Sequence, residues 1–320
     1  MKIKIYKLIF LLVLPNILIS QKIDNLTSFR EIKSDSYFRF SYENDFFSAT
    51  DRDYTQGYSL EFVNSKLEKN PINHLFFNLD KSNYKYGISI EHIGFTPNNY
   101  VSSEIQFGDR PFSSAIMLKS FNIAIDSIRK RRIAQTFSLG LIGPGAFGKE
   151  MQVEIHKVTG NKIPGGWDNQ IKNDLVINYK VDYEKQLIRY TDLFALQANS
   201  SMQLGTLFSN ASVGFNTQIG IINSPFTLNK PEKAFRLYAY AQPIVKVVGY
   251  DATLQGGVFN KESVYNISSG SIERFTAQFN YGIVIKTKTL YFEYSKSFIT
   301  KEFNSGNSAK WGGFKIGFTL

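Results

Sequence analysis

The sequence lacks cysteine altogether, and its 320 residues include only 2 Trp, 4 Met and 3 His. Without cysteine, neither a disulfide framework nor a thiolate metal site can form. No G-x-S-x-G motif is present, so the sequence offers no nucleophile elbow for a Ser–His hydrolase, and no EF-hand spacing occurs. After the N-terminal segment, no stretch approaches the ~20 apolar residues that a transmembrane helix needs.

The N-terminus has the composition of an export signal. Three lysines precede the apolar run 8–19, and polar residues follow from Ser20. This pattern is typical of a secretory signal peptide, here residues 1–20. No Pro-, Ser- or Gly-rich linker divides the remainder, so we expect a lead-in over 21–35 and one domain over 36–320.

The chain carries a formal charge of +10, which becomes +7 when the three lysines of the predicted signal peptide are removed. A basic balance suits anionic partners. In an exported protein, anionic lipid is the better candidate. The dense cluster at 129–132 is typical of a solvated turn, so we expect no nucleic-acid binding.

Aromatic residues are abundant, with 28 Phe and 18 Tyr, and they follow a period of two. The clearest segment places Phe275, Phe279 and Ile283 on one face and Gln278 and Asn280 on the other. Such alternation predicts β-strands with one apolar and one polar face. The segments run for about ten residues or more, which is the length that a tilted strand needs to cross a bilayer.

The pattern predicts an all-β fold, a twelve-stranded antiparallel transmembrane β-barrel. An even number of strands closes such a barrel with both termini in the periplasm. A periplasmic all-β domain is the alternative, and the alternation that continues to Leu320 disfavours it. The predicted strands are residues 36–45, 54–63, 84–95, 112–124, 132–143, 173–187, 192–204, 208–220, 235–250, 272–286, 290–302 and 310–320. Strand direction then places the connections 46–53, 96–111, 144–171 and 251–271 outside the cell.

The segment 148–170 predicts a short helix within one extracellular loop, because glycines and a proline bracket it tightly. Gln152 and His156 are four residues apart, so they lie on the same face of that helix. An imidazole preceded by an amide one turn earlier is a candidate for chemistry. The alternative is a histidine that only packs or meets solvent, which is our interpretation of His74 and His92.

The first outward turn, within residues 42–57, is rich in oxygen ligands. By strand alternation Asp45 and Thr55 fall on the polar face, while Asn44 ends its strand where it can reach a neighbouring loop. Carboxylate, amide and hydroxyl oxygens together suit a hard cation such as Ca²⁺. An acidic surface hairpin without a metal is the alternative.

Four patches of the sequence resemble one family. They are YENDFF with DRDYTQG in the first turn, GDRPFS at 108–113, IGPGAFGKEMQVEIHKVTG continuing to PGGWDNQ, and GYDATLQGG at 249–257. With them the chain resembles the outer-membrane lipid A 3′-O-deacylases, the LpxR-like proteins, over nearly all of its length after the signal. The resemblance implies a twelve-stranded barrel whose active site lies between barrel wall and loop helix, facing the outer leaflet.

The resemblance also implies a mechanism like that of a secreted phospholipase A2. Ca²⁺, or another divalent metal, would polarise the ester carbonyl while His156 removes a proton from water and Gln152 orients water or substrate. Asn44 and Thr55 match catalytic and metal-site positions, and Asp45 matches a metal ligand. Lipid A is anionic, so basic residues on the outer loops are expected to pair with its phosphates. These are Arg52, Arg110, Lys149, Lys157 and Lys162.

Two positions depart from the family pattern. Lys162 stands where relatives carry a glutamate six residues beyond the histidine. A basic residue that relatives use in the third outward loop has no match in 98–107, and Arg110 is the available substitute. The carboxylates that could compensate for the missing glutamate are Glu150, Glu154 and Asp168.

The sequence therefore predicts a calcium-dependent ester hydrolase of the outer membrane that removes 3′-linked acyl chains from lipid A and acts as a monomer. Two alternatives stay open. One is an outer-membrane phospholipase, since the same ion and imidazole would cleave a glycerophospholipid ester. The other is a non-catalytic barrel or channel that retains a vestigial site.

Overall fold

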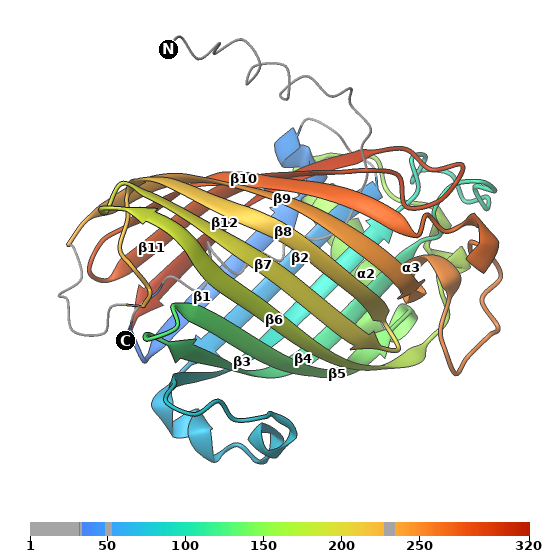
Figure 1. The fold of residues 1–320 in the computed structure, drawn as a ribbon. Helices are drawn as coiled ribbons and strands as arrows, with labels where there is room; N and C mark the ends of the chain where they lie inside the picture. The colour runs from blue at the N-terminus through green and yellow to red at the C-terminus, as the bar shows by residue number, and fades with distance from the viewer. Residues whose placement is uncertain (1–31, 33, 49–52, 227–233) are drawn as a thin grey trace, which may run out of the picture.

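Twelve antiparallel strands close into one barrel in the computed structural model, which describes residues 32, 34–48, 53–226 and 234–320 (Figure 1). The predicted signal peptide, most of the lead-in and Arg52 lie outside the described residues. The strands are β1 (Tyr37–Asn44), β2 (Asp53–Val63), β3 (Asn83–Thr96), β4 (Ser113–Asp126), β5 (Arg131–Ile142), β6 (Asp174–Tyr190), β7 (Phe194–Gly205), β8 (Phe208–Ile221), β9 (Arg236–Asp251), β10 (Phe275–Lys286), β11 (Leu290–Ile299) and β12 (Ala309–Thr319).

The predicted barrel and its strand count are confirmed. Each strand pairs with its neighbours along the chain, and β1 closes the barrel on β12, from Tyr37 opposite Thr319 to Asn44 opposite Gly312. β10 begins at Phe275 rather than 272, because Ile272 instead forms an isolated bridge with Phe303 of the facing loop. Closure matters because every strand then has two partners and no backbone edge is left open.

Short helices decorate the two ends of the barrel. At one end lie η3 (Asp45–Ser48), η6 (Pro144–Ala146), α2 (Gly148–Thr159), η7 (Gly166–Asn169), α3 (Ala252–Gln255) and η8 (Ser269–Ser271). We call this end the helix rim. The opposite end, the terminal rim, carries η4 (Ser65–Lys69) and η5 (Pro71–Leu75) between β2 and β3. Among the described residues, no helix combines the length and the apolar character needed to cross a bilayer.

The alternation along each strand gives the wall an outer face and a lumen face. In β10, Phe275 is 72% exposed and Ile283 is 51% exposed, whereas Gln278 and Asn280 are buried. Apolar side chains on the outside of a closed barrel match a lipid environment. Polar side chains turn inward, where they can pair with one another.

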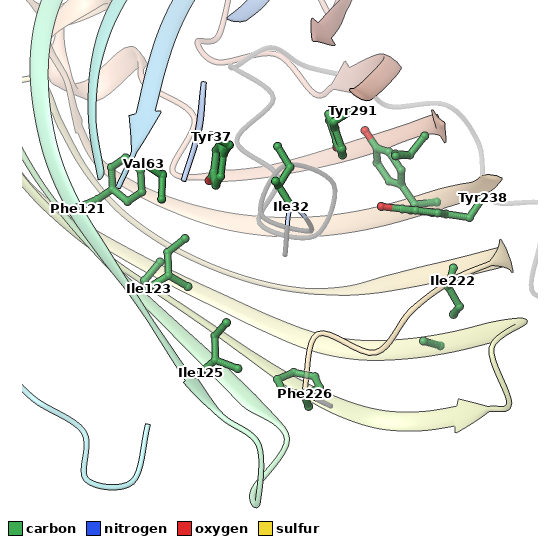
Figure 2. Close-up of a cluster of buried hydrophobic side chains, with 14 residues drawn as sticks. Ile32, Tyr37, Val63, Phe121, Ile123, Ile125, Ile222, Phe226, Tyr238 and Tyr291 are labelled. Carbon is green, nitrogen blue, oxygen red and sulfur yellow. The ribbon is translucent and has the colours of Figure 1, made fainter. Parts of the chain in front are cut away.

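Two clusters of buried apolar side chains, which we call layers, line the two ends of the lumen. Figure 2 shows the first, at the terminal rim, where Ile32 lies among side chains that include Tyr37, Tyr291 and Phe226. The second, which we call the upper layer, lies under the helix rim and contains Tyr54, Ile93, Phe95, Ala115, Met117, Ile142, Ile171, Val176, Leu207, Ala252, Ile299 and Trp311. A permeant ion would have to cross both layers.

Between the two layers the lumen is polar and its charges are paired. Ion pairs between neighbouring strands have N–O distances from 2.5 to 3.1 Å. They include Arg39–Glu61 at 2.8 Å, Glu91–Lys119 at 2.5 Å and Lys315–Glu293 at 3.1 Å, and a further pair, Arg132–Glu184 at 2.7 Å, lies level with Ile125 of the terminal-rim layer. A charge buried away from water is tolerated only with such a partner.

The two apolar layers lead us to expect that purified protein inserted into a planar lipid bilayer gives no steady ionic conductance. Replacing Tyr238 and Tyr291 together by alanine thins the layer at the terminal rim and is expected to raise the frequency of transient current steps. A stable open-channel current from the wild-type barrel would contradict this expectation and favour the alternative that the protein is a channel.

Candidate functional site at the helix rim

The oxygen-rich turn begins where β1 ends. Asn44 donates from Nδ2 to the Thr55 carbonyl, and its Oδ1 accepts from the Phe46 backbone N–H at 2.7 Å. This local bond starts the 3₁₀ turn η3 and fixes the amide. Asp45 is 2% exposed, whereas the next residue, Phe46, is 76% exposed. The turn therefore holds a buried carboxylate beside an amide at the rim.

Thr55 sits in a β-bulge. The register between β2 and β3 shifts between Tyr54, opposite Phe95, and Gln56, opposite Gly94, so Thr55 is the extra residue. Alternation from Ser59 placed Thr55 on the lumen face, and the bulge interrupts that alternation by giving the lumen position to Tyr54 of the upper layer.

The Thr55 hydroxyl meets a second hydroxyl across the bulge. Thr55 Oγ1 lies 2.6 Å from Thr96 Oγ1, and both residues are buried. Thr96, the last residue of β3, was not among the predicted site residues because nothing in its own sequence context marks it. The bulge thus adds a second hydroxyl to the oxygen-rich turn.

The predicted loop helix is present as α2. It starts after Phe147, which has a φ of +60°, and ends at Gly160, with a φ of +72° in the left-handed region that favours glycine. Its first residue has to be small. A Cβ on Gly148 would lie 2.5 Å from Ser114 Oγ and 2.8 Å from Trp167. The glycine therefore allows the helix to pack directly on β4.

Gln152 is buried on the inner face of α2, as the four-residue spacing predicted. Its Oε1 accepts from Trp167 Nε1 at 2.7 Å. An indole N–H can only donate, so this contact fixes which end of the amide is oxygen. The Nε2 of Gln152 is buried and has no hydrogen-bond partner among the described residues. The amide is therefore fixed in orientation, and its N–H groups remain available to donate to a ligand.

His156 lies one turn further on the same buried face. Its Nδ1 is 2.6 Å from the Lys162 carbonyl oxygen, and its ring packs edge-on against Tyr100 with centroids 5.4 Å apart. Since a carbonyl can only accept, Nδ1 carries the proton and neutral His156 has its lone pair on Nε2. Lys162 acts here through its backbone, so the missing family glutamate is not needed to orient the ring.

One loop connects the two groups. Thr96 contacts Thr55, and the loop that follows it brings Tyr100 against His156 and accepts at the Tyr100 carbonyl from Gly165 N at 3.0 Å. Four residues span at most about 14 Å even when extended. The histidine and the oxygen-rich turn therefore belong to the same stretch of the helix rim.

The predicted phosphate-binding residues have different surroundings. Arg110 is 1% exposed, donates to Glu302 at 3.2 Å and to Thr253 at 3.3 Å, and stacks 4.1 Å over the ring of Phe95. It ties three rim segments together. The side chain of Lys162 is exposed.

The carboxylates named as substitutes for the family glutamate lie on the surface. Exposed Lys149 pairs with Asp168 at 2.6 Å, and exposed Lys157 pairs with Glu154 at 2.7 Å. Glu150 is exposed as well. None of these contacts reaches His156, so the Lys162 carbonyl remains the group that orients the ring.

A metal at this rim would be held mainly by neutral oxygens. The described residues contain no cluster of three or more His, Cys, Asp or Glu side chains. The donors near the turn are the Asp45 carboxylate, the Asn44 amide oxygen, the Thr55 hydroxyl and backbone carbonyls. This all-oxygen set fits a hard cation such as Ca²⁺, and a single carboxylate predicts weak binding.

Comparison with known proteins decides the family. The model described as "Outer membrane protein LpxR" matches residues 8–320. This chain belongs to the LpxR family. LpxR from Salmonella typhimurium has a similar structure, with a TM-score of 0.74 and 20% sequence identity over 89% of this chain and 100% of that one.

Other solved barrels are less similar to this LpxR-family chain. The β domain of the Bordetella autotransporter BrkA gives a TM-score of 0.47 at 6% identity, covering 90% of this chain and 100% of that one. The porin KdgM gives 0.39 at 6% identity, covering 89% and 99%. No curated protein matched the sequence. Family membership identifies the chain as an outer-membrane protein and supports lipid A deacylase activity at the level of the family.

Sequence reasoning missed the residues that hold Gln152 and His156 in place. Trp167 lay within a quoted patch and is one of only two tryptophans, which was an available signal. Tyr100 lies in a loop without any periodic pattern, so no sequence signal marked it. Both are aromatic residues whose role depends on how the rim loops fold over α2.

The close packing of Gly148 predicts the effect of adding one methyl group. Gly148→Ala is expected to lower the free energy of unfolding by about 1–3 kcal/mol, because Ser114 and Trp167 must shift. The matched control is Gly270→Ala, where a Cβ would meet nothing within 4 Å, and its effect should stay within about 0.5 kcal/mol. Urea titration followed by tryptophan fluorescence measures both. Equal stability of the two variants would show that α2 is not tightly seated.

Proposed function

We propose that this protein is a lipid A 3′-O-deacylase of the outer membrane, with His156 as general base and Ca²⁺ as the favoured metal. The observation that carries the proposal is the contact of His156 Nδ1 with the Lys162 carbonyl. It leaves Nε2 as the basic atom, one helical turn from Gln152, whose Nε2 has no hydrogen-bond partner among the described residues. A base and an oxyanion donor from one helix face suit ester hydrolysis.

In the proposed reaction, His156 Nε2 takes a proton from water as the water oxygen attacks the acyl carbonyl. The carbonyl π electrons move to its oxygen, which accepts a hydrogen bond from Gln152 Nε2. When the tetrahedral intermediate collapses, the bond to the sugar 3′ oxygen breaks. Protonated His156 returns its proton to that oxygen, which releases the fatty acid and a sugar hydroxyl.

Asp45, Asn44 and Thr55 would hold the metal. When bound there, Ca²⁺ would supply electrostatic stabilisation of the developing oxyanion. Asn44 keeps its own amide fixed through Thr55 O and Phe46 N, so this part of the site needs no rearrangement of the turn. Thr55 and Thr96 share one hydrogen bond, which leaves lone pairs on both oxygens.

The helix rim would face the outer leaflet, with export directed by residues 1–20. Lipid A phosphates would then meet exposed cations. Lys157 and Lys162 are exposed, and the Lys149 side chain is partly exposed and paired with Asp168. Lys162 also supplies the carbonyl that contacts His156. We keep Arg52 and Arg110 as predicted phosphate contacts of lower rank, since Arg110 is buried and paired with Glu302. We expect a monomer.

The decisive experiment compares His156→Ala with His74→Ala. His74 is an exposed histidine in η5 at the opposite rim, so it serves as the matched control. Loss of the base is expected to lower deacylation by at least about 100-fold, whereas His74→Ala should retain wild-type activity. Mass spectrometry of lipid A from cells that express each variant measures the 3′-linked acyl chain.

Chelation completes that experiment. Removing divalent ions should abolish wild-type activity, and adding Ca²⁺ back should restore it. Wild-type protein that leaves lipid A acylation unchanged but hydrolyses glycerophospholipids would replace the proposal with a phospholipase. Activity that survives in His156→Ala would show that His156 is not the general base.

Lys162 provides a test that separates backbone from side chain. Because only its carbonyl contacts His156, Lys162→Ala should leave kcat nearly unchanged. If its ammonium group contacts a phosphate, KM should rise about fivefold, the factor for roughly 1 kcal/mol of exposed ion pairing. A large fall in kcat would show that the side chain takes part in the chemistry.

A further inference from the structure

A row of four residues crosses the outer face of the barrel just below the helix rim. We call Asn44, Gln56, Gly94 and Ser114 the rim row, one residue from each of β1 to β4. Gln56 lies opposite Gly94, and Gly94 lies opposite Ser114. The register that pairs Glu43 with Gly57 continues to place Asn44 beside Gln56. The row spans three strand spacings, about 14 Å.

These side chains point away from the lumen. Ile93 and Phe95 belong to the upper layer inside the barrel, so Gly94 between them faces outward. Gln56 shares that face, because its Cγ lies 3.4 Å from the position of a Cβ on Gly94. The ring of His92 borders the same point, with its Cε1 3.8 Å away.

Gln56 has one end of its amide held and the other free. It is 1% exposed, and its Oε1 accepts from the Tyr58 hydroxyl at 3.2 Å. Tyr58 is itself fixed by stacking on Tyr42, with ring centroids 5.1 Å apart. The Nε2 of Gln56 is buried and has no hydrogen-bond partner among the described residues. A buried donor without an acceptor costs stability, so it calls for an explanation.

Gln152 on α2 repeats this arrangement. In both glutamines an aromatic residue donates to the amide oxygen, and in both the Nε2 is buried without a partner in the described parts of the chain. Gly148, one turn before Gln152, packs on Ser114 at one end of the row, while Asn44 of the oxygen-rich turn lies at the other end. Gly94 in the middle has no side chain, and the Gln56 amide lies over it, with Nε2 3.7 Å from the position of a Cβ on Gly94.

We propose that Gln56 is a further substrate-contacting residue, whose Nε2 donates to the carbonyl oxygen of an acyl chain lying across Gly94. The proposal rests on the proposed function. An uncharged donor in a buried position suits a carbonyl, because a phosphate taken out of water requires a cation to pair with it. Gln56 would donate to the acyl group from the barrel wall, while Gln152 would donate to it from α2.

The test replaces Gln56 by leucine, with Gln197→Leu as the matched control. Gln197 is also fully buried in a strand, and both of its amide atoms lack partners among the described residues, but it neighbours lumen-facing Ala195 of the terminal-rim cluster. Gln56→Leu should lower kcat/KM for lipid A at least about tenfold, and Gln197→Leu should not. Gln56→Glu should fail as well, since a carboxylate cannot donate.

A binding assay separates this proposal from the proposed function. Lipid A in detergent micelles is titrated onto His156→Ala protein with and without Gln56→Leu. Adding Gln56→Leu should raise the Kd about tenfold. Heat-modifiable gel migration identifies folded barrels, and Gln56→Met replaces the leucine variant if that one does not fold. A folded variant with wild-type binding and kinetics would overturn the assignment of Gln56. Wild-type protein without hydrolysis would instead overturn the reaction, while the binding arm would still report on Gln56.

Discussion

The pairing of β1 with β12 is the constraint on which the rest of the molecule depends. A strand in lipid must satisfy all of its backbone groups within the protein, and closure is the only way for a sheet to do so. Closure with this register fixes which residues of β1 to β4 stand at the same height. The positions of the strand ends therefore determine where the loops of the helix rim begin and end, and the loops pack against these fixed positions.

Buried side-chain contacts fix the loops of the helix rim in place. Trp167 packs between α2 and Phe112, with ring centroids 5.1 Å apart, and donates to Gln152. Arg110 joins its loop to Glu302 and Thr253 beneath the surface. The Trp167 contact fixes the amide of Gln152, and the Lys162 carbonyl fixes the ring of His156. Under the proposed function, groups fixed in this way would lose less free energy when the transition state forms.

The strands could be predicted because their signal is periodic. Alternation over ten or more residues identifies a strand, and each of the twelve strands was recognised from it with small errors at the ends. The helix was predictable from Gly148, Gly160 and the spacing of Gln152 and His156. The orientation of Thr55 could not be predicted, because a bulge shifts the alternation by one residue and no periodic pattern marks the bulge in the sequence.

The site was only partly predictable for a related reason. Gln152 and His156 are close in sequence, so their shared face follows from helix geometry alone. The contact of His156 with the Lys162 carbonyl depends on a loop conformation, and the side chain at 162 gives no hint of it. Gln56 stood in a quoted patch but looked like an ordinary strand residue, since only the register with Gly94 shows what surrounds it.

The outward direction of the rim row determines how any ligand must arrive. Because the rim row faces outward and not into the lumen, a lipid that binds there under the proposed function would arrive by lateral diffusion within the leaflet rather than from bulk solution. Encounter frequency is then governed by the mole fraction of the lipid in its own surface. Diluting the membrane with inert lipid would slow such an encounter, whereas diluting the surrounding buffer would not.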